Sequence, residues 1–181
     1  MLFNGKVSAF GMNRIGEDEM ADEPAGETII VDETGRGDFQ VRVQAGSGSF
    51  LMDEPVPAGG LGSGPNPYDL LSAAIGACSL MTIRLYARRS GWPLERVRVK
   101  VTHHRSSLEA RDRFVREIFL TGDLNETQRA KLLDISRRCP VHKTMERGAD
   151  IETTLLPGAA LDAHATTLCE HARDANEACD E

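Results

Sequence analysis

Three short segments near the start of the chain have the composition of strands, and in one of them hydrophobic and polar residues alternate. In residues 38–44, DFQVRVQ, the three apolar side chains share one face and the polar side chains share the other. A period of two is typical of an antiparallel strand with one solvated face. Residues 27–33, ETIIVDE, and 49–54, SFLMDE, are also predicted to be strands, with glycine-rich turns between the three. The pattern predicts an antiparallel meander.

A long apolar helix is predicted from Pro67 to about Ser90, after the Gly- and Pro-rich loop DEPVPAGGLGSGPNP. Asn66 is a suitable N-cap, and Gly91 followed by Pro93 ends the helix. The middle of this helix is apolar nearly all round, so it must be buried on most sides. A dimer would cover such a helix more easily than one small domain.

The second half of the chain has further alternating segments. Residues 95–104 and 113–122 have the pattern of a hairpin, and residues 124–139 that of an amphipathic helix. A short further helix is predicted at 139–146, CPVHKTME, and a closing strand at 149–155, ADIETTL. Strands, helix, strands, helices and strand in this order predict an α+β fold.

Length and composition define the class of protein. The chain has 181 residues, of which 40% are hydrophobic and 27% charged, so it is expected to form a folded core. We expect a polar N-terminal segment at residues 1–27 and one folded domain at 28–156. An acidic tail at 157–181 follows, and its sequence also allows an exposed or loosely docked helix.

Charge and hydropathy argue against several classes of partner. The net charge is −7 and the basic residues are dispersed, whereas phosphate binding needs a clustered basic surface, so no nucleic acid is expected. The first residues lack the apolar core of a secretory signal, and no bilayer span is expected. These features predict no membrane partner and a cytoplasmic protein, in which cysteines are thiols rather than structural disulfides.

Two of the four cysteines stand in informative surroundings. Cys78 lies in the apolar helix, where a free thiol is most often a packing residue, and its own helix offers no cation to activate it. Cys139 precedes Pro140 in the basic segment RRCPVHKT, and a thiol at the start of a helix in positive surroundings ionises more easily. Two such thiols brought together could exchange with a peroxide and with each other. His142 in this segment is expected to be a hydrogen-bonded structural residue.

Metal binding is the alternative chemistry for these residues. Cys139 and His142 have the spacing of half a zinc site, and His103 and His104 with Cys78 could supply the rest. The tail also carries cysteine and histidine, but without zinc-like spacing: His164, Cys169, His171 and Cys179. We expect no metal and no other cofactor.

Three blocks of this sequence resemble the OsmC/Ohr family of osmotically induced and organic-hydroperoxide-resistance proteins. They are DEPVPAGG, then GPNPYDLLSAAIGACSLMTIRLYARRSGWPL, then RRCPVHKT about sixty residues later, and the resemblance extends from Thr28 to Leu155. It implies an OsmC-like α+β fold, an intertwined homodimer in which antiparallel sheets surround long buried central helices.

The resemblance also implies an activity. In peroxidase members the cysteine of the central helix attacks the hydroperoxide and the one before Pro-Val forms a disulfide with it; here these are Cys78 and Cys139. An external dithiol, typically lipoyl-linked in the family, then restores the thiols. The activating arginine of such peroxidases best matches Arg36, for which an ordinary turn residue is the alternative.

One position departs from the family pattern. Strong hydroperoxidases of the family carry a glutamate ten residues before the helix cysteine, where this chain has Tyr68, with Asp69 only at the next place. The leading hypothesis is therefore a peroxidase that uses Cys78 as nucleophile, Cys139 as resolving thiol and Arg36 as activator. The alternative is an OsmC-like small-molecule-binding or redox-sensing protein without significant turnover.

Overall fold

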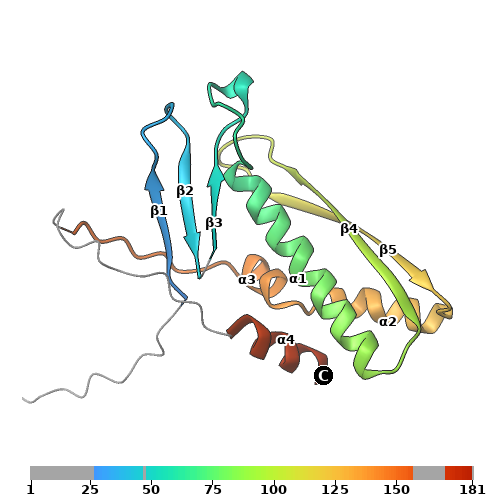
Figure 1. The fold of residues 1–181 in the computed structure, drawn as a ribbon. Coiled ribbons are helices and arrows are strands. Elements are labelled where there is room, and N and C mark those ends of the chain that lie inside the picture. The colour runs from blue at the N-terminus through green and yellow to red at the C-terminus, as the bar shows by residue number, and fades with distance from the viewer. Residues whose placement is uncertain (1–26, 47, 157–169, 181) are drawn as a thin grey trace, which may run out of the picture.

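The computed structural model describes residues 27–46, 48–156 and 170–180. They form an α+β fold in which one long helix lies between a three-stranded antiparallel sheet and a two-stranded one (Figure 1). The fold class predicted from the order of strands and helices is confirmed.

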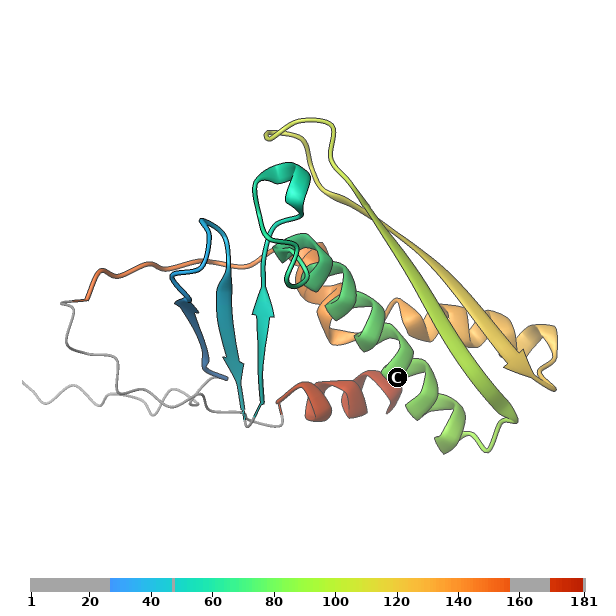
Figure 2. The same cartoon turned by 45° about the horizontal axis from the view of Figure 1, so that its top comes forward.

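The N-terminal sheet lies to one side of the long helix (Figures 1 and 2). Its strands pair antiparallel in chain order, which confirms the predicted meander: β1 (Ile29–Glu33), β2 (Val41–Ala45) and β3 (Gly48–Met52). Val43 of the middle strand is buried, but Val31, which pairs with it, is 57% exposed. The described residues thus leave the apolar face of this sheet largely uncovered.

Helix α1 (Pro67–Arg89) begins and ends close to the predicted residues. The Asn66 side chain accepts a hydrogen bond from the Asp69 amide at 3.0 Å, and the Asp69 carboxylate accepts one from the Asn66 amide at 3.1 Å. This reciprocal capping box satisfies two amides that the first helical turn leaves unpaired. At the other end Gly91 has a φ of 64°, a conformation that glycine adopts without strain.

A hairpin and a second helix form the main core with α1. Strands β4 (Leu94–His104) and β5 (Arg113–Gly122) pair antiparallel as predicted, and α2 (Glu126–Ser136) packs beside them against α1. A Cβ at Gly76 would lie 3.1 Å from the Val101 side chain, so this glycine allows α1 to approach β4 closely. The buried core cluster comprises Ile83, Ala87, Leu94, Val97, Leu124 and Leu132.

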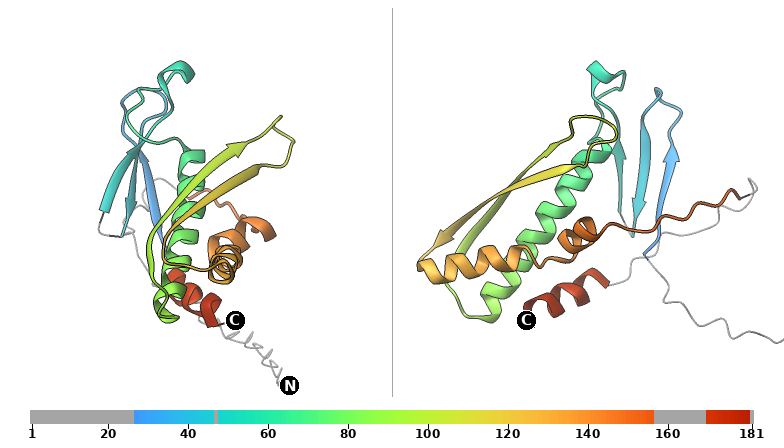
Figure 3. Two further views of the ribbon diagram at one scale, coloured as in Figure 1. Left: turned by 90° about the vertical axis from the view of Figure 1, so that its right-hand side faces the viewer. Right: turned by 180° about the vertical axis from the view of Figure 1, so that it is seen from behind.

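Two shorter helices complete the described structure. Helix α3 (Pro140–Arg147) lies beside α2 against α1, and α4 (Glu170–Asp180) packs against both α1 and α3 (Figure 3). Ala175 and Cys179 of α4 are buried, and Arg89 donates hydrogen bonds to the Asn176 carbonyl and side chain. This part of the tail is docked rather than exposed; His164 and Cys169 lie outside the described residues.

Among the described residues, one helix, α1, has the length and composition of a membrane span, with a mean hydropathy of 1.5 over its most apolar window. In this structure α1 packs against β4 and against α2, α3 and α4. These contacts are those of the central helix of a folded domain.

The predicted closing strand at 149–155 is wrong for the single chain. Residues 150–156 have no regular secondary structure, and the side chains of Ile151 and Leu155 are 87% and 97% exposed. An alternating segment becomes a strand only when it pairs with another strand, and no described strand of this chain pairs with it.

Candidate active site

The fold brings Cys78 and Cys139 together. Cys78 lies in the middle of α1, and Cys139 is the N-cap residue of α3, where Pro140 starts the helix. The two thiols are hydrogen-bonded to each other, and the Val141 amide donates to Cys78 Sγ at 3.4 Å. Both sulfur atoms therefore lie at the amide end of α3.

Both thiols are enclosed by protein. Cys78 is 2% exposed and Cys139 is 0% exposed. Burial removes water from a thiolate and disfavours the charged form unless hydrogen bonds or a nearby cation replace the water. The chemistry of the pair therefore depends on the polar groups around it.

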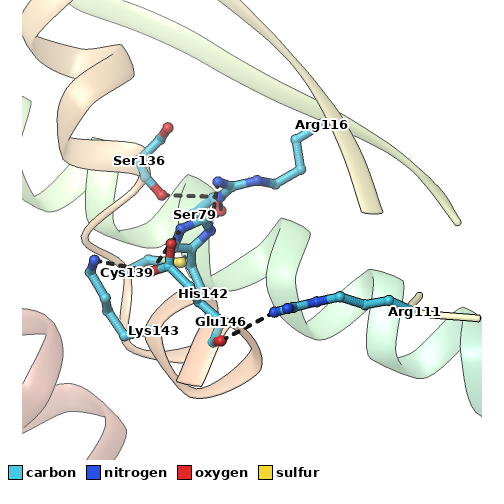
Figure 4. A network of polar contacts seen from close by, with 8 residues as sticks. All are labelled: Ser79, Arg111, Arg116, Ser136, Cys139, His142, Lys143 and Glu146. Carbon is cyan, nitrogen blue, oxygen red and sulfur yellow. Dashed lines mark hydrogen bonds and ion pairs between the residues drawn. The ribbon is translucent and has the colours of Figure 1, made fainter. Parts of the chain in front are cut away.

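Arg116 of β5 supplies a cation to this site (Figure 4). Its guanidinium donates to Ser79 Oγ and to the Ser136 carbonyl, the latter at 3.0 Å, and its second nitrogen lies 2.9 Å from His142 Nδ1. Ser79 Oγ in turn lies 3.5 Å from Cys139 Sγ. A chain of polar contacts thus links the cation to a thiol.

These contacts shift the pKa values of the two thiols in opposite directions. The pKa of Cys139 is lowered, first by the hydrogen bond from Cys78, and further by those from Ser79 and the His142 amide and by the charge of Arg116, against the effect of burial. The pKa of Cys78 is raised, because its proton is held by Cys139 and because it is buried. The polar groups around Cys139 thus favour its thiolate, whereas those around Cys78 favour its thiol.

His142 is held in one protonation state by its neighbours. An arginine only donates hydrogen bonds, so His142 Nδ1 accepts from Arg116 and carries no proton. The other ring nitrogen faces Glu146 at 3.8 Å. Burial, and after it the charge of Arg116, lowers the pKa of His142. This agrees with the expectation of a hydrogen-bonded structural histidine.

The other residues singled out in the sequence lie elsewhere. Arg36 lies exposed in the turn between β1 and β2, where its amide donates to Thr34 Oγ1, so the single chain does not place it with the thiols as it places Arg116. Its predicted role as activator stays a prediction. Asp69 acts as the first-turn cap of α1.

Tyr68 and His103 form a separate cluster at the start of α1. The Tyr68 hydroxyl accepts a hydrogen bond from Arg105 at 2.7 Å, and its ring stacks on His103 at 4.5 Å. His103 Nε2 lies 2.7 Å from Asp112. The described residues contain no group of three or more histidines, cysteines or acids placed to hold a metal ion.

Arg116 and Ser79 were not predicted as site residues. A signal for Arg116 exists in the sequence, because it alternates in register with Phe114, Ile118 and Leu120 and so falls on the apolar face of its strand. A charged residue on a core-facing position needs a polar partner in the interior. Ser79 carries no comparable signal beyond its place next to Cys78.

An α+β fold with a buried dithiol at the junction of its long helix and a short one defines a class of protein with known members. A protein-family model described as OsmC-like protein matches residues 60–154. The chain belongs to the OsmC-like protein family, as the three sequence blocks indicated.

Solved structures share this fold at low sequence identity. The OsmC-like protein from Mycoplasma pneumoniae is 20% identical, with a TM-score of 0.59 over 68% of this chain and 89% of that chain. The organic hydroperoxide resistance protein OsmC from Legionella pneumophila is 21% identical, with a TM-score of 0.52 over 68% and 90%. An OsmC-like protein of unknown function from Vibrio cholerae is 10% identical, with a TM-score of 0.51 over 66% and 93%. A search of curated proteins finds no match.

Proposed function

We propose that this protein is a thiol-dependent peroxidase that reduces organic hydroperoxides. The observation that carries the proposal is the pair of hydrogen-bonded thiols, Cys78 and Cys139, with a cation two contacts away. Two thiols supply the two electrons that cleave a peroxide bond. Membership of the OsmC-like family supports a role in peroxide stress, and the Legionella relative is named for organic hydroperoxide resistance.

In the proposed reaction, the Cys78 sulfur attacks the terminal oxygen of the hydroperoxide. The O–O bond breaks, the alkoxide takes a proton and leaves as the alcohol, and Cys78 becomes a sulfenic acid. Cys139 then attacks the Cys78 sulfur, so that a disulfide forms and the displaced hydroxide takes a proton from solvent and leaves as water. An external dithiol, of the chemical class to which the reduced lipoyl group belongs, supplies two electrons and two protons to restore the thiols.

The proposal includes a homodimer in the cytoplasm, without a metal or prosthetic group. The exposed apolar side chains of β1 and of residues 150–156 support a partner surface. Arg36 lies on the same sheet, so its proposed contact with Cys78 depends on how two copies assemble.

Stopped-flow loss of free thiol with one equivalent of cumene hydroperoxide tests this proposal. We expect rapid loss in the reduced wild type, no such loss in Cys78→Ser, and a reaction that stops at sulfenic acid in Cys139→Ser. Cys179→Ser is the matched control, because Cys179 is also buried and its thiol contacts the Thr82 carbonyl. Thiol loss no faster than that of free cysteine would contradict the proposal.

A second candidate is a redox-sensing or small-molecule-binding protein without significant turnover. The burial of both sulfur atoms and the engagement of Tyr68 with Arg105, where strong peroxidases have glutamate, favour it. A sensor would form the disulfide once and slowly, whereas a peroxidase consumes many equivalents of hydroperoxide when dihydrolipoamide is supplied.

A further inference from the structure

Arg116 carries a charge for which the described residues supply no carboxylate counterion. Its three hydrogen-bond partners are the Ser79 hydroxyl, the Ser136 carbonyl and the His142 ring, all neutral acceptors. Among the described residues no carboxylate forms an ion pair with it. A partly buried guanidinium without a carboxylate favours an anion nearby, since the interior screens charges less than water does.

The Ser79 hydroxyl lies between this cation and the thiol pair. It accepts from Arg116, lies 2.6 Å from the Ile75 carbonyl and 3.5 Å from Cys139 Sγ. A hydroxyl has one proton to donate. While Cys139 is a thiol, the Ser79 hydroxyl donates its hydrogen bond to the Ile75 carbonyl. When Cys139 is a thiolate, the hydroxyl can rotate and donate to the sulfur instead. Donation from Arg116 makes the hydroxyl a stronger donor in that state.

We propose that Arg116, acting through Ser79, is the positioning residue that keeps Cys139 ionised, so that Cys139 accepts the Cys78 proton during attack on the hydroperoxide. This inference rests on the proposed peroxidase function for its last step only. The ionisation of Cys139 is a property of the reduced protein and is measured without a peroxide.

The proton balance follows from this arrangement. In the proposed reduced state the pair holds one proton, on Cys78, and Cys139 is the thiolate. As the Cys78 sulfur attacks, its proton moves to Cys139 and from there to the departing alkoxide, which leaves as the alcohol. Cys139 is then a thiolate again and displaces hydroxide from the Cys78 sulfenic acid. One ionised residue thus serves as base in the first step and as nucleophile in the second.

Other charges around Cys139 are less well placed for this role. On its own segment, Arg138 is paired with Asp134 and Lys143 with Glu146. The facing element α4 brings Asp174 and Glu177 to a cavity that Arg138 and Lys143 also line, so acids and bases are mixed there. From α1 and β5 the facing groups are Cys78 and Arg116. Arg116 is therefore the cation whose charge is directed at the pair.

The test is the ultraviolet absorbance of the thiolate as a function of pH, because it requires no access of a reagent to buried sulfur. In wild type we expect a first thiolate that is lost in Cys139→Ser and kept in Cys78→Ser. Arg116→Met should raise its midpoint by about one to two pH units, toward the ordinary cysteine value of about 8.5. Arg116→Lys, which keeps the charge, should bring the midpoint part of the way back to the wild-type value.

Two further variants distinguish an effect on the ionisation of Cys139 from a general effect on folding. Ser79→Ala removes one hydroxyl and should raise the same midpoint by a smaller amount, even if Arg116→Met folds poorly. Arg98→Met, on an exposed position of the neighbouring strand β4, is the matched control and should leave the midpoint unchanged. The pKa of Cys139 is lowered to about 6, so at pH 7 disulfide formation in Arg116→Met should slow about twofold if the midpoint rises by one pH unit and about tenfold if it rises by two. The rate should recover at higher pH, whereas a merely structural defect would not recover.

An unchanged midpoint in both Arg116→Met and Ser79→Ala would overturn the inference, as would a first thiolate that belongs to Cys78. Failure of the peroxidase proposal has a different signature. In that case the thiolate titrates as described while the wild type does not consume cumene hydroperoxide.

Discussion

Two regions of this chain bury their apolar side chains to very different extents. Around α1, the side chains of Ile83 and Leu132 are completely enclosed by β4, β5 and α2. The second region comprises the N-terminal sheet and residues 150–156. There Val31 is mostly exposed although its strand is paired, and Leu155 is almost fully exposed. The first region is completed by consecutive elements of one chain, whereas the second has no covering layer within the residues described.

The difference shows where a single chain is sufficient. Burying a large apolar side chain is worth roughly 1.5–3 kcal/mol, so several exposed ones favour a covering surface. The thiol pair belongs to the complete region: Cys78, Cys139 and Arg116 are assembled from α1, α3 and β5 of one chain. One chain is therefore sufficient to bring the two thiols and Arg116 together.

The largest expected effect on stability comes from a cavity in the buried core around α1. Ile83→Ala removes a fully buried side chain and leaves a cavity, so we expect a loss of about 2–5 kcal/mol in the free energy of unfolding. Leu155→Ala is the contrasting variant and should cost less than about 0.5 kcal/mol in the same urea titration, performed at a concentration where the protein is monomeric. Equal losses would remove the distinction between the regions.

The incomplete region is tested by charging its exposed apolar residues. Ile151→Asp combined with Leu155→Asp should weaken self-association by at least about tenfold, since a carboxylate in an interface must be desolvated. Light scattering after gel filtration measures the oligomer, and circular dichroism checks that the fold persists. Leu108→Asp, in the exposed loop between β4 and β5, is the control. A wild type that is already monomeric would contradict the prediction.

Helix α4 packs against α1 and α3, and this contact can be weakened by a substitution in α4 alone. Ala175 is buried, so Ala175→Asp should release α4 and raise the rate at which Cys179 reacts with a thiol reagent by about tenfold or more. The measurement uses a background in which the other three cysteines are serine. Glu177→Gln, at an exposed position of the same helix, should react like its parent. Fast labelling of the parent itself would show that α4 does not protect Cys179.

The smallest expected effect concerns the loop that joins the two regions. Burial by itself raises the pKa of Asp53, but hydrogen bonds from the Ser63 hydroxyl and the Ser63, Glu54 and Leu61 amides outweigh it and lower the pKa below its usual value. A lowered carboxylate pKa contributes stability that is present above the unfolded-state pKa, about 3.9, and is lost as the pH falls through the folded-state value.

Thermal unfolding at several pH values tests this contribution. Asp53→Asn should unfold at a lower temperature than wild type at neutral pH, and the difference should shrink below about pH 4. Asp123→Asn serves as control, because no comparable set of hydrogen bonds surrounds that carboxylate among the described residues. A difference independent of pH would mean that the carboxylate charge does not matter.

Much of the local structure was predictable because its causes are local. The alternation of the early strands, the capping residues Asn66 and Asp69, and the breaks at Gly91 and Pro140 act over a few residues. The closing strand at 149–155 was predicted from the same kind of pattern and was wrong, since a strand also needs a partner edge that the pattern does not contain.

The candidate site was predictable in part. Cys78 and Cys139 were selected through their sequence context and family resemblance, and the structure brings them together. Arg36 was selected in the same way, and the single chain places it in an exposed turn. Arg116 was visible only as a charged residue on the apolar face of its strand, which indicates a buried partner without naming it.

The sequence by itself therefore determined the elements, their ends and the two thiols, because periodicity, capping and turn chemistry depend on neighbouring residues. Only the tertiary structure decided that Ser79 links Arg116 to Cys139, and that the pKa values of the two thiols shift in opposite directions. Proximity between α1, β5 and α3 arises from packing of elements far apart in the chain, and the pKa of a buried thiol depends on that proximity.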